Sequence, residues 1–211
     1  MPPAAIIRLA QDSDAAAIAD IYRPSVDSSV ISFETRPPDE DEIKRRLART
    51  LPTHPWIVCE LRSTSHDPSG GRVAGYAYAS QHQERSAYRW SVNVSVYIDE
   101  KCRRAGVGRG LYASLFAILT AQGYVNAYAG ITLPNPSSVG LHEAMGFERF
   151  VVYRKVGYKL GAWHDVGWWQ RALNAHDPTP REPIDVPTLA RDPRWASLLA
   201  TGVASVRGAA C

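Results

Sequence analysis

The sequence predicts a mixed α+β fold in which helices cover both faces of one central sheet. Two observations carry this prediction. Three strand patterns between residues 56 and 98 follow one another across short connections, which favours antiparallel pairing, and a later strand–helix–strand run favours one parallel pair. The 211 residues, of which 45% are hydrophobic and 21% charged, suffice for one domain with a substantial core, or for one domain plus a tail.

The N-terminal region is predicted to form one strand and two helices. An apolar run at residues 6–9 predicts the strand. Asp12 then caps an amphipathic helix, and Pro24 is expected to end or kink that helix near its last turn. A loop at residues 28–38 follows, and Asp39 caps the second helix.

Three strands are predicted in the middle of the chain. Residues 56–61 and 73–80 form the first two, joined by a turn at residues 63–71 that is rich in Ser and Gly. The third strand, SVNVSVYI at residues 91–98, alternates strictly between apolar and polar side chains. Asn93 is therefore a polar residue in the middle of a strand.

Beyond this strand, the pattern predicts two helices separated by one strand. A helix with an apolar stripe begins at Val107 and ends at Gly123, a typical C-cap. A strand at residues 125–131, a short helix at residues 138–145 and an extended segment at residues 147–158 follow.

The last part of the chain is predicted to be an appended tail. We expect residues 1–173 to form the folded domain and residues 174–211 to form a proline-rich extension with a short helix around residues 195–199. The proline-rich run HDPTPREPIDVP marks the start of this extension.

The charge of the chain argues against a nucleic-acid partner. The formal net charge is only +3, whereas a nucleic-acid-binding domain usually has an extended basic face. The basic residues that do gather lie in one turn, which suits a small polyanion: Lys101, Arg103, Arg104 and Arg109. No apolar run resembles a signal peptide or a membrane span, and the cysteine spacing indicates no metal site. We therefore expect a cytoplasmic protein with no membrane partner and no metal.

The turn at residues 103–108, RRAGVG, is predicted to bind a phosphate-bearing ligand. A strand enters it and a helix leaves it, so the unpaired N–H groups and the dipole of the helix N-terminus face the turn. Glycine allows a close approach of the backbone, and the arginines add formal charge. The turn lacks both the Gly-Lys-Ser/Thr of a P-loop and the first glycine of a dinucleotide fingerprint. Alone, it is equally compatible with an ordinary helix start beside solvated arginines.

Several segments together resemble the GCN5-related N-acetyltransferase (GNAT) superfamily. The R-x-x-G-x-G turn at residues 103–108 and the segment NPSSVGLHEAMGF at residues 135–147 occur there in this order. Three stretches narrow the resemblance to phosphinothricin and methionine-sulfoximine N-acetyltransferases: SFET, AYRWSVNVSVYI and GYKLGAWHDVGWWQRAL. The resemblance covers about residues 6–173. It implies the GNAT fold, a mixed and mostly antiparallel sheet with one splayed parallel strand pair and helices on both faces.

By this resemblance, the protein is an enzyme and a homodimer. It moves the acetyl group of acetyl-CoA to the amine of a small amino-acid-like acceptor by direct attack. The cosubstrate enters where the parallel strands splay, an N–H group of the strand stabilises the charge on the carbonyl oxygen, and the arginine turn holds the pyrophosphate. Asn135 is implied to contact the pantetheine arm; Asn-Pro also favours a helix cap or turn residue, and the two roles are compatible. The residues implied for cofactor binding are Val96, Tyr97, Ile98, Arg103, Arg104, Ala105, Gly106, Val107, Gly108, Arg109 and Asn135.

His142 occupies the position at which many superfamily members have a tyrosine that protonates the leaving thiolate. An imidazole suits this transfer, and the alternative role is that of a packed core histidine. The implied acceptor carries a carboxylate and a phosphinate, which call for guanidinium partners. The residues implied for the acceptor site are Phe33, Arg85, Ser86, Ala87, Tyr88 and Arg89.

Asn93 departs from the family, which usually has Glu at this position as the general base. An amide cannot take the ammonium proton at physiological pH. The base is then another residue, for which His142, Asp165 and Glu34 are candidates, or the acceptor amine is already partly neutral and Asn93 positions it or a water.

Two other functions are compatible with Asn93. The protein could bind acetyl-CoA without catalysis, as a sensor whose tail recruits a partner, or it could acetylate protein N-termini. The first is disfavoured by the presence of His142 and Asn135, and the second by the small-substrate signature. An active N-acetyltransferase with a changed acceptor is the preferred interpretation.

Overall fold

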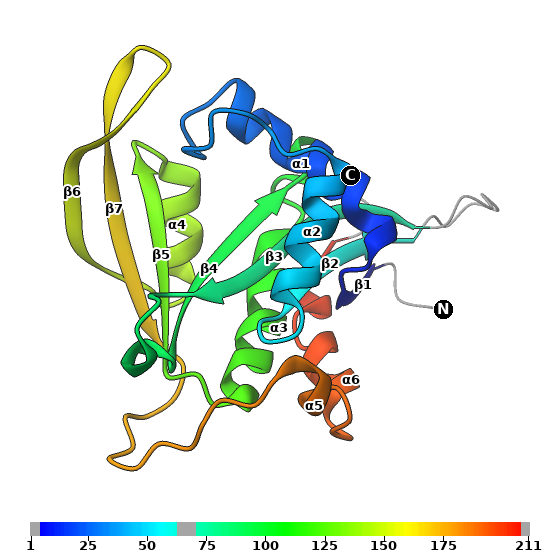
Figure 1. The fold of residues 1–211 in the computed structure, drawn as a ribbon. Coiled ribbons are helices and arrows are strands. Elements are labelled where there is room, and N and C mark those ends of the chain that lie inside the picture. The colour runs from blue at the N-terminus through cyan, green and yellow to red at the C-terminus, as the bar shows by residue number, and fades with distance from the viewer. Residues whose placement is uncertain (1–4, 63–70, 208–211) are drawn as a thin grey trace.

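The computed structural model describes residues 5–62 and 71–207, which form a seven-stranded mixed sheet with the order β1-β2-β3-β4-β5-β7-β6 (Figure 1). Neighbouring strands are antiparallel, except for the parallel pair β4–β5. The strands are β1 (Ala5–Leu9), β2 (Trp56–Leu61), β3 (Arg72–Gln81), β4 (Ser91–Ile98), β5 (Asn126–Leu133), β6 (Glu148–Lys159) and β7 (Ala162–Ala172). Apart from Gly71, the predicted turn at residues 63–71 lies outside the described residues.

Helices cover both faces of this sheet, so the predicted fold class is confirmed. The helices are α1 (Ala15–Asp27), α2 (Glu40–Thr50), α3 (Val107–Gln122), α4 (Pro136–Ala144), α5 (Val186–Leu189) and α6 (Trp195–Ala200). On one face, α1 and α2 bury residues such as Ile18 and Ile43 against Trp56 of β2. On the other face, α3 buries Leu111 and Leu115 against the apolar side of β4. Burial of these apolar side chains is the main stabilising contribution to the fold.

Two local features bear on the predicted elements. Pro24 lies in the last turn of α1, which ends at Asp27. The strand β7 was not predicted from the residue pattern. Many side chains of β6 and β7 are exposed, and Gly157 and Gly167 interrupt their alternation, so the usual period of a half-buried strand is weak there.

The C-terminal segment runs back along α3, from the end of that helix to its beginning. At the far end, the N–H of Ile184 donates to the carbonyl oxygen of Gln122 at 2.9 Å. Further on, the N–H of Gly202 donates to Ser114 Oγ at 3.0 Å. A Cβ atom on Gly110 would lie only 2.7 Å from the Gly202 carbonyl oxygen, so the two backbones touch here. The segment is thus packed on the core and reaches the start of α3.

Candidate active site

The strands β4 and β5 separate directly after a short paired stretch. Their last paired residues are Asn93 and Tyr128, although β4 continues to Ile98 and β5 to Leu133. Figure 1 shows the two strands diverging from this point. Backbone groups of β4 that face the split have no strand partner there and can bind a ligand. The expected splayed pair is therefore confirmed.

A narrow cavity lies in this split. It has a volume of about 50 Å³. It is lined by Ile31, Val94, Ser95, Val96, Tyr97, Tyr112, Gly130, Ile131, Thr132, Asn135, Ser138 and His142. The lining comes from both strands, from α3 and α4, and from the loop after α1, so the split is enclosed by elements far apart in the chain.

A larger cavity of about 670 Å³, which we call the cradle, extends from the split to the start of α3. It is lined by Ser25, Ile31, Val96, Tyr97, Ile98, Cys102, Arg103, Arg104, Gly106, Val107, Gly108, Arg109, Asn135, Pro136, Ser137, Ser138, Gly140, Leu141 and Arg207. Most residues predicted to bind the cofactor line the split or the cradle. Ala105 lines neither cavity, because its side chain is fully buried in the hydrophobic core.

The N-terminus of α3 faces the cradle without a side-chain cap. Gly106, the N-cap residue, adopts the left-handed conformation with φ of +81°, as its predicted role requires. The N–H groups of the first turn are therefore free for a ligand. Arg104 and Arg109 form no ion pair with any described residue, whereas Arg103 pairs with Glu100 at 2.9 Å. This unneutralised positive charge suits a phosphate group.

Two features of the cradle were not predicted from the sequence. Arg207, from the C-terminal segment, lines the cradle and donates from Nη2 to the Arg104 carbonyl oxygen at 2.8 Å. A Cβ atom on Gly106 would collide with the backbone of Ser205, so this glycine is required by the tail as well as by its positive φ. The tail thus forms one wall of the cradle, a contact that no local pattern indicates.

The side chain of His142 is 4% exposed and lines the split. Its Nδ1 lies 2.8 Å from the Ser138 carbonyl oxygen, which can only accept, so Nδ1 carries the proton. Its Nε2 lies 2.8 Å from the Tyr112 hydroxyl, which therefore donates to it. Burial lowers the pKa of His142, and the bond to Ser138 opposes this shift. The neutral imidazole is thus favoured, with Tyr112 as its partner.

Asn135 is a helix cap, as one of its two predicted roles requires, and it lies on the walls of both cavities. Its side chain caps α4, accepting from the Ser138 N–H at 3.1 Å, and it also lines the split and the cradle. The cap holds the side chain in a fixed orientation at the junction of the two cavities.

An open hollow of about 400 Å³ lies at the end of β3. It is lined by Gln81, His82, Gln83, Glu84, Arg85 and Tyr88. Of the residues predicted for the acceptor site, Arg85 and Tyr88 therefore face this hollow. His82 was missed by the sequence analysis. Its imidazole Nδ1 lies 2.8 Å from the Asn93 Oδ1 atom.

The other predicted acceptor residues lie elsewhere. Phe33 does not line the hollow: it packs on Gly157, where an added Cβ would collide with its ring, and lies 6.5 Å from the His164 ring. Arg89 pairs with Glu182 of the tail at 2.6 Å. Ser86 and Ala87 are exposed in the turn beside the hollow.

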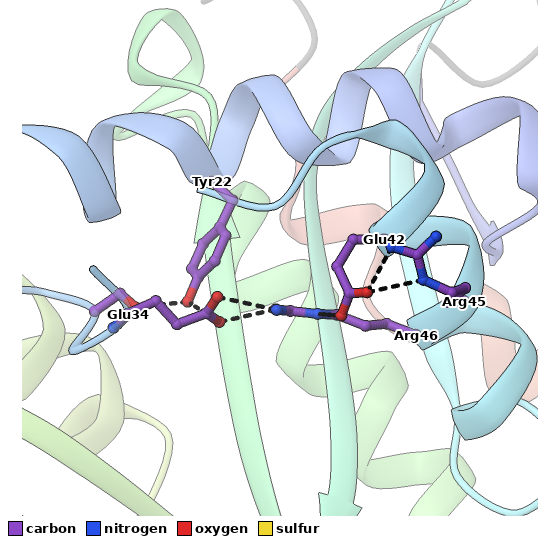
Figure 2. Close-up of polar contacts among 6 residues, drawn as sticks. Tyr22, Glu34, Glu42, Arg45 and Arg46 are labelled. Carbon is purple, nitrogen blue, oxygen red and sulfur yellow. Dashed lines mark hydrogen bonds and ion pairs between the residues drawn. The ribbon is translucent and has the colours of Figure 1, made fainter. Parts of the chain in front are cut away.

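Glu34, a candidate base, is held in a network of charged and polar groups (Figure 2). Arg46 of α2 donates two hydrogen bonds to its carboxylate, at 2.8 and 2.9 Å, and the Tyr22 hydroxyl of α1 donates a third at 2.9 Å. The Arg46 bond is the largest cause of the lowered pKa of Glu34. Such a carboxylate is a weak base, and its role here is to attach the loop after α1 to both helices.

Asp165, a second candidate base, is similarly engaged. Its carboxylate accepts from Lys155 N–H and from Arg154 Nη1, each at 2.8 Å, and these bonds lower its pKa. It lies on β7 and does not line the hollow or the split.

Comparison with known proteins agrees with this geometry. A family model described as "Acetyltransferase (GNAT) domain" matches residues 7–168. The chain is 39% identical to phosphinothricin N-acetyltransferase of Streptomyces viridochromogenes, over 84% of this chain and 92% of that protein. It is 31% identical to an L-methionine sulfoximine/L-methionine sulfone acetyltransferase of Salmonella typhimurium, over 81% of this chain and 95% of that protein.

A solved structure gives the same result. The phosphinothricin acetyltransferase of Sinorhizobium meliloti, determined in complex with AcCoA, superimposes with a TM-score of 0.77 at 36% identity, over 90% of this chain and 100% of that one. The chain belongs to the GNAT acetyltransferase family. It is an N-acetyltransferase similar to enzymes named for phosphinothricin and methionine sulfoximine.

Proposed function

We propose that this enzyme transfers the acetyl group of acetyl-CoA to the amine of a small amino-acid-like acceptor, of the phosphinothricin or methionine sulfoximine type. The observation that carries the proposal is the continuity of the site. A basic cradle at a helix N-terminus leads into the split between β4 and β5, and the last paired residue of β4, Asn93, contacts a residue of the open hollow. The names of the relatives support the acceptor class.

The residues present fit acetyl-CoA. The uncapped start of α3, together with Arg104, Arg109 and Arg207, would hold the phosphates. Asn135 and the unpaired backbone of β4, including Val96, would hold the narrow pantetheine arm. When bound, acetyl-CoA supplies an activated acetyl group. A backbone N–H of β4 in the split would stabilise negative charge on the acetyl oxygen.

The hollow would bind the acceptor. Arg85 lines it and forms no ion pair with a described residue, so its guanidinium is free to bind a carboxylate or phosphinate. Tyr88 supplies an aromatic wall and is 46% exposed, which leaves its ring accessible. An acceptor bound here would have its amine close to Asn93 and the split.

Thiol release from acetyl-CoA over a panel of amines tests this function. We expect release with methionine sulfoximine or phosphinothricin that depends on the acceptor and greatly exceeds the rate with N-terminal peptides. The matched variant Arg85→Gln should raise the KM for the acceptor about tenfold or more, because it removes a charge-assisted hydrogen bond worth about 1.5–3 kcal/mol. Binding of acetyl-CoA without thiol release for any amine would instead support the sensor function.

We also propose that the enzyme is a cytoplasmic homodimer that binds neither membranes nor nucleic acid. Among the described residues, no helix is long and apolar enough to span a bilayer. The hairpin β6–β7 exposes large apolar side chains, a composition typical of an interface. These are Phe150, Tyr153, Val156, Tyr158, Leu160 and Trp163. Light scattering of the wild type and of Trp163→Glu tests the dimer, which the variant should weaken.

A further inference from the structure

His82 lies at the point where the parallel pair ends. Its Nδ1 atom is 2.8 Å from Asn93 Oδ1, and its ring stacks on Tyr128 with centroids 4.2 Å apart. Asn93 and Tyr128 are the last paired residues of β4 and β5, and the next residue of β4, Val94, already lines the split. His82 itself lines the open hollow. The imidazole therefore lies on the wall of the hollow and contacts the residue of β4 that precedes the split.

The contacts of Asn93 determine which ring nitrogen of His82 carries the proton. The Asn93 Nδ2 group donates to the Gln81 carbonyl oxygen at 3.4 Å. A flipped amide would place its oxygen against that carbonyl, which is repulsive, so Oδ1 must face His82. Oδ1 can only accept, and Nδ1 of His82 is consequently the N–H donor. In the neutral ring, Nε2 is then left with its lone pair free.

The groups around His82 are mainly aromatic rings. The rings of Tyr128, Tyr88 and Trp168 surround it, at 4.2, 6.0 and 6.4 Å between centroids. The charged residues that share the hollow with it are Glu84 and Arg85, both exposed. No described carboxylate pairs with the imidazole, and its hydrogen-bond partner Asn93 is uncharged.

We propose that His82 is the general base of this enzyme and that Asn93 is its positioning residue. This inference rests on the proposed function. The ammonium nitrogen of the acceptor gives one proton to His82 Nε2, which later passes it to solvent. The neutral nitrogen then forms the N–C bond to the acetyl carbon, while the C–S bond breaks and its electron pair goes to sulfur. The nitrogen loses a second proton to solvent, and the sulfur takes up one proton from solvent and leaves as the thiol. Asn93 thus takes part in proton removal through the histidine that it orients.

Substitution of His82 tests the base. His82→Gln should lower kcat by about 10²–10⁴-fold with the best acceptor of the panel, while binding of acetyl-CoA is unchanged. The kcat/KM of the wild type should fall at acid pH, where Nε2 is protonated. The variant should lack this acid limb. Its rate should instead rise with pH towards the pKa of the acceptor amine. The matched control is His176→Gln, since His176 is exposed in the tail.

Substitution of Asn93 tests the positioning role. Asn93→Asp preserves an oxygen acceptor for Nδ1–H and should retain activity, with the acid limb moved to higher pH because a carboxylate favours the charged imidazole. Asn93→Leu removes the acceptor and should lower kcat with little change in the KM for acetyl-CoA. If Asn93→Asp retains activity and Asn93→Leu loses it, a role of Asn93 in packing alone does not account for the result.

Nitrogen NMR of the enzyme without substrates gives a readout independent of turnover. The ¹⁵N shifts of His82, assigned by their loss in His82→Gln, should show the Nδ1–H form in the wild type and a shift towards the Nε2–H form in Asn93→Leu. A wild-type Nε2–H form would overturn the inference. So would an active wild type whose His82→Gln variant retains its rate and acid limb, in which case the proposed function still stands. A wild type that releases no thiol with any amine overturns both.

Discussion

At the scale of single residues, the pair formed by His82 and Asn93 depends on a contact between neighbouring strands. Strand alternation places Asn93 on the polar face of β4, but it does not show which side chain reaches it from β3. In the structure, Ser80 lies opposite Asn93, and His82 approaches from just beyond the end of β3. The amide that cannot act as a base by itself thereby becomes the group that orients one.

His142 is the candidate proton donor, yet its environment favours the neutral imidazole because burial lowers its pKa. If it delivers a proton to the leaving sulfur, it does so together with Tyr112, whose hydroxyl donates to Nε2. We expect His142→Phe to lower kcat by about 10²-fold, the low end for general acid catalysis, with a much smaller change in acetyl-CoA binding. Steady-state kinetics and calorimetric titration measure the two effects.

Tyr112→Phe is the companion variant, which tests the other member of this pair. It keeps the ring that stacks on Phe116, with centroids 4.9 Å apart, and removes only the hydroxyl. If both variants retain the wild-type kcat, His142 is a packed core residue and the proton comes from elsewhere.

At the scale of elements, the loop after α1 is attached to three parts of the fold. Ile31 of this loop lines both the split and the cradle. Its neighbour Ser32 bonds to Tyr22 of α1 at 2.6 Å and accepts from Lys159 Nζ of β6 at 2.7 Å. Glu34 joins the loop to α2 through Arg46 (Figure 2). These contacts hold Ile31 over the split.

The Glu34–Arg46 pair predicts a specific pH dependence of stability. The pKa of Glu34 is lower in the folded protein than its ordinary value, so the pair stabilises the fold above the unfolded-state pKa and loses this effect as pH falls through the folded-state pKa. Arg46→Gln should lower the free energy of unfolding by about 1 kcal/mol at pH 7, because the pair is partly exposed and solvent screens it. The loss should shrink below pH 4, as urea titrations at both pH values can show.

Arg45→Gln is the control for that experiment. Among the described residues, Arg45 bonds only to Glu42, at 3.0 Å. It is exposed, so its loss leaves the Glu34 pair in place. A loss of stability in Arg46→Gln that is the same at pH 7 and below pH 4 would show that the pair contributes no pH-dependent stabilisation.

At the scale of the whole molecule, the tail links the two ends of the site. Near its start, Glu182 pairs with Arg89 beside the hollow, and the Arg181 carbonyl accepts from Trp90 Nε1 at 2.8 Å. At its end, Arg207 lines the cradle. The residues between them pack along α3, so the segment expected to be an extension also forms part of the surroundings of the site.

Arg207 is therefore expected to contribute to cosubstrate binding. Arg207→Gln should weaken acetyl-CoA binding about tenfold, since it removes one charge-assisted contact to a phosphate, worth about 1.5–3 kcal/mol. Calorimetry of the variant against Arg191→Gln, which changes an exposed arginine of the same tail outside the cradle, measures this effect. Equal Kd values for the two variants would show that the tail only packs on α3.

The sequence by itself determined the fold class and the family, and it predicted the two contiguous halves of the cosubstrate site. The two halves are the turn at residues 103–109 and the segment at residues 135–142. Each is a short continuous segment, so its pattern is visible in residues that lie a few positions apart. Only the tertiary structure brought His82 to Asn93, placed Arg207 in the cradle and revealed the strand β7. His82 meets Asn93 through the pairing of β3 with β4, Arg207 meets Arg104 through the path of the tail along α3, and β7 has no strong alternation. Contacts between distant segments depend on the packing of the whole chain, which no local pattern specifies.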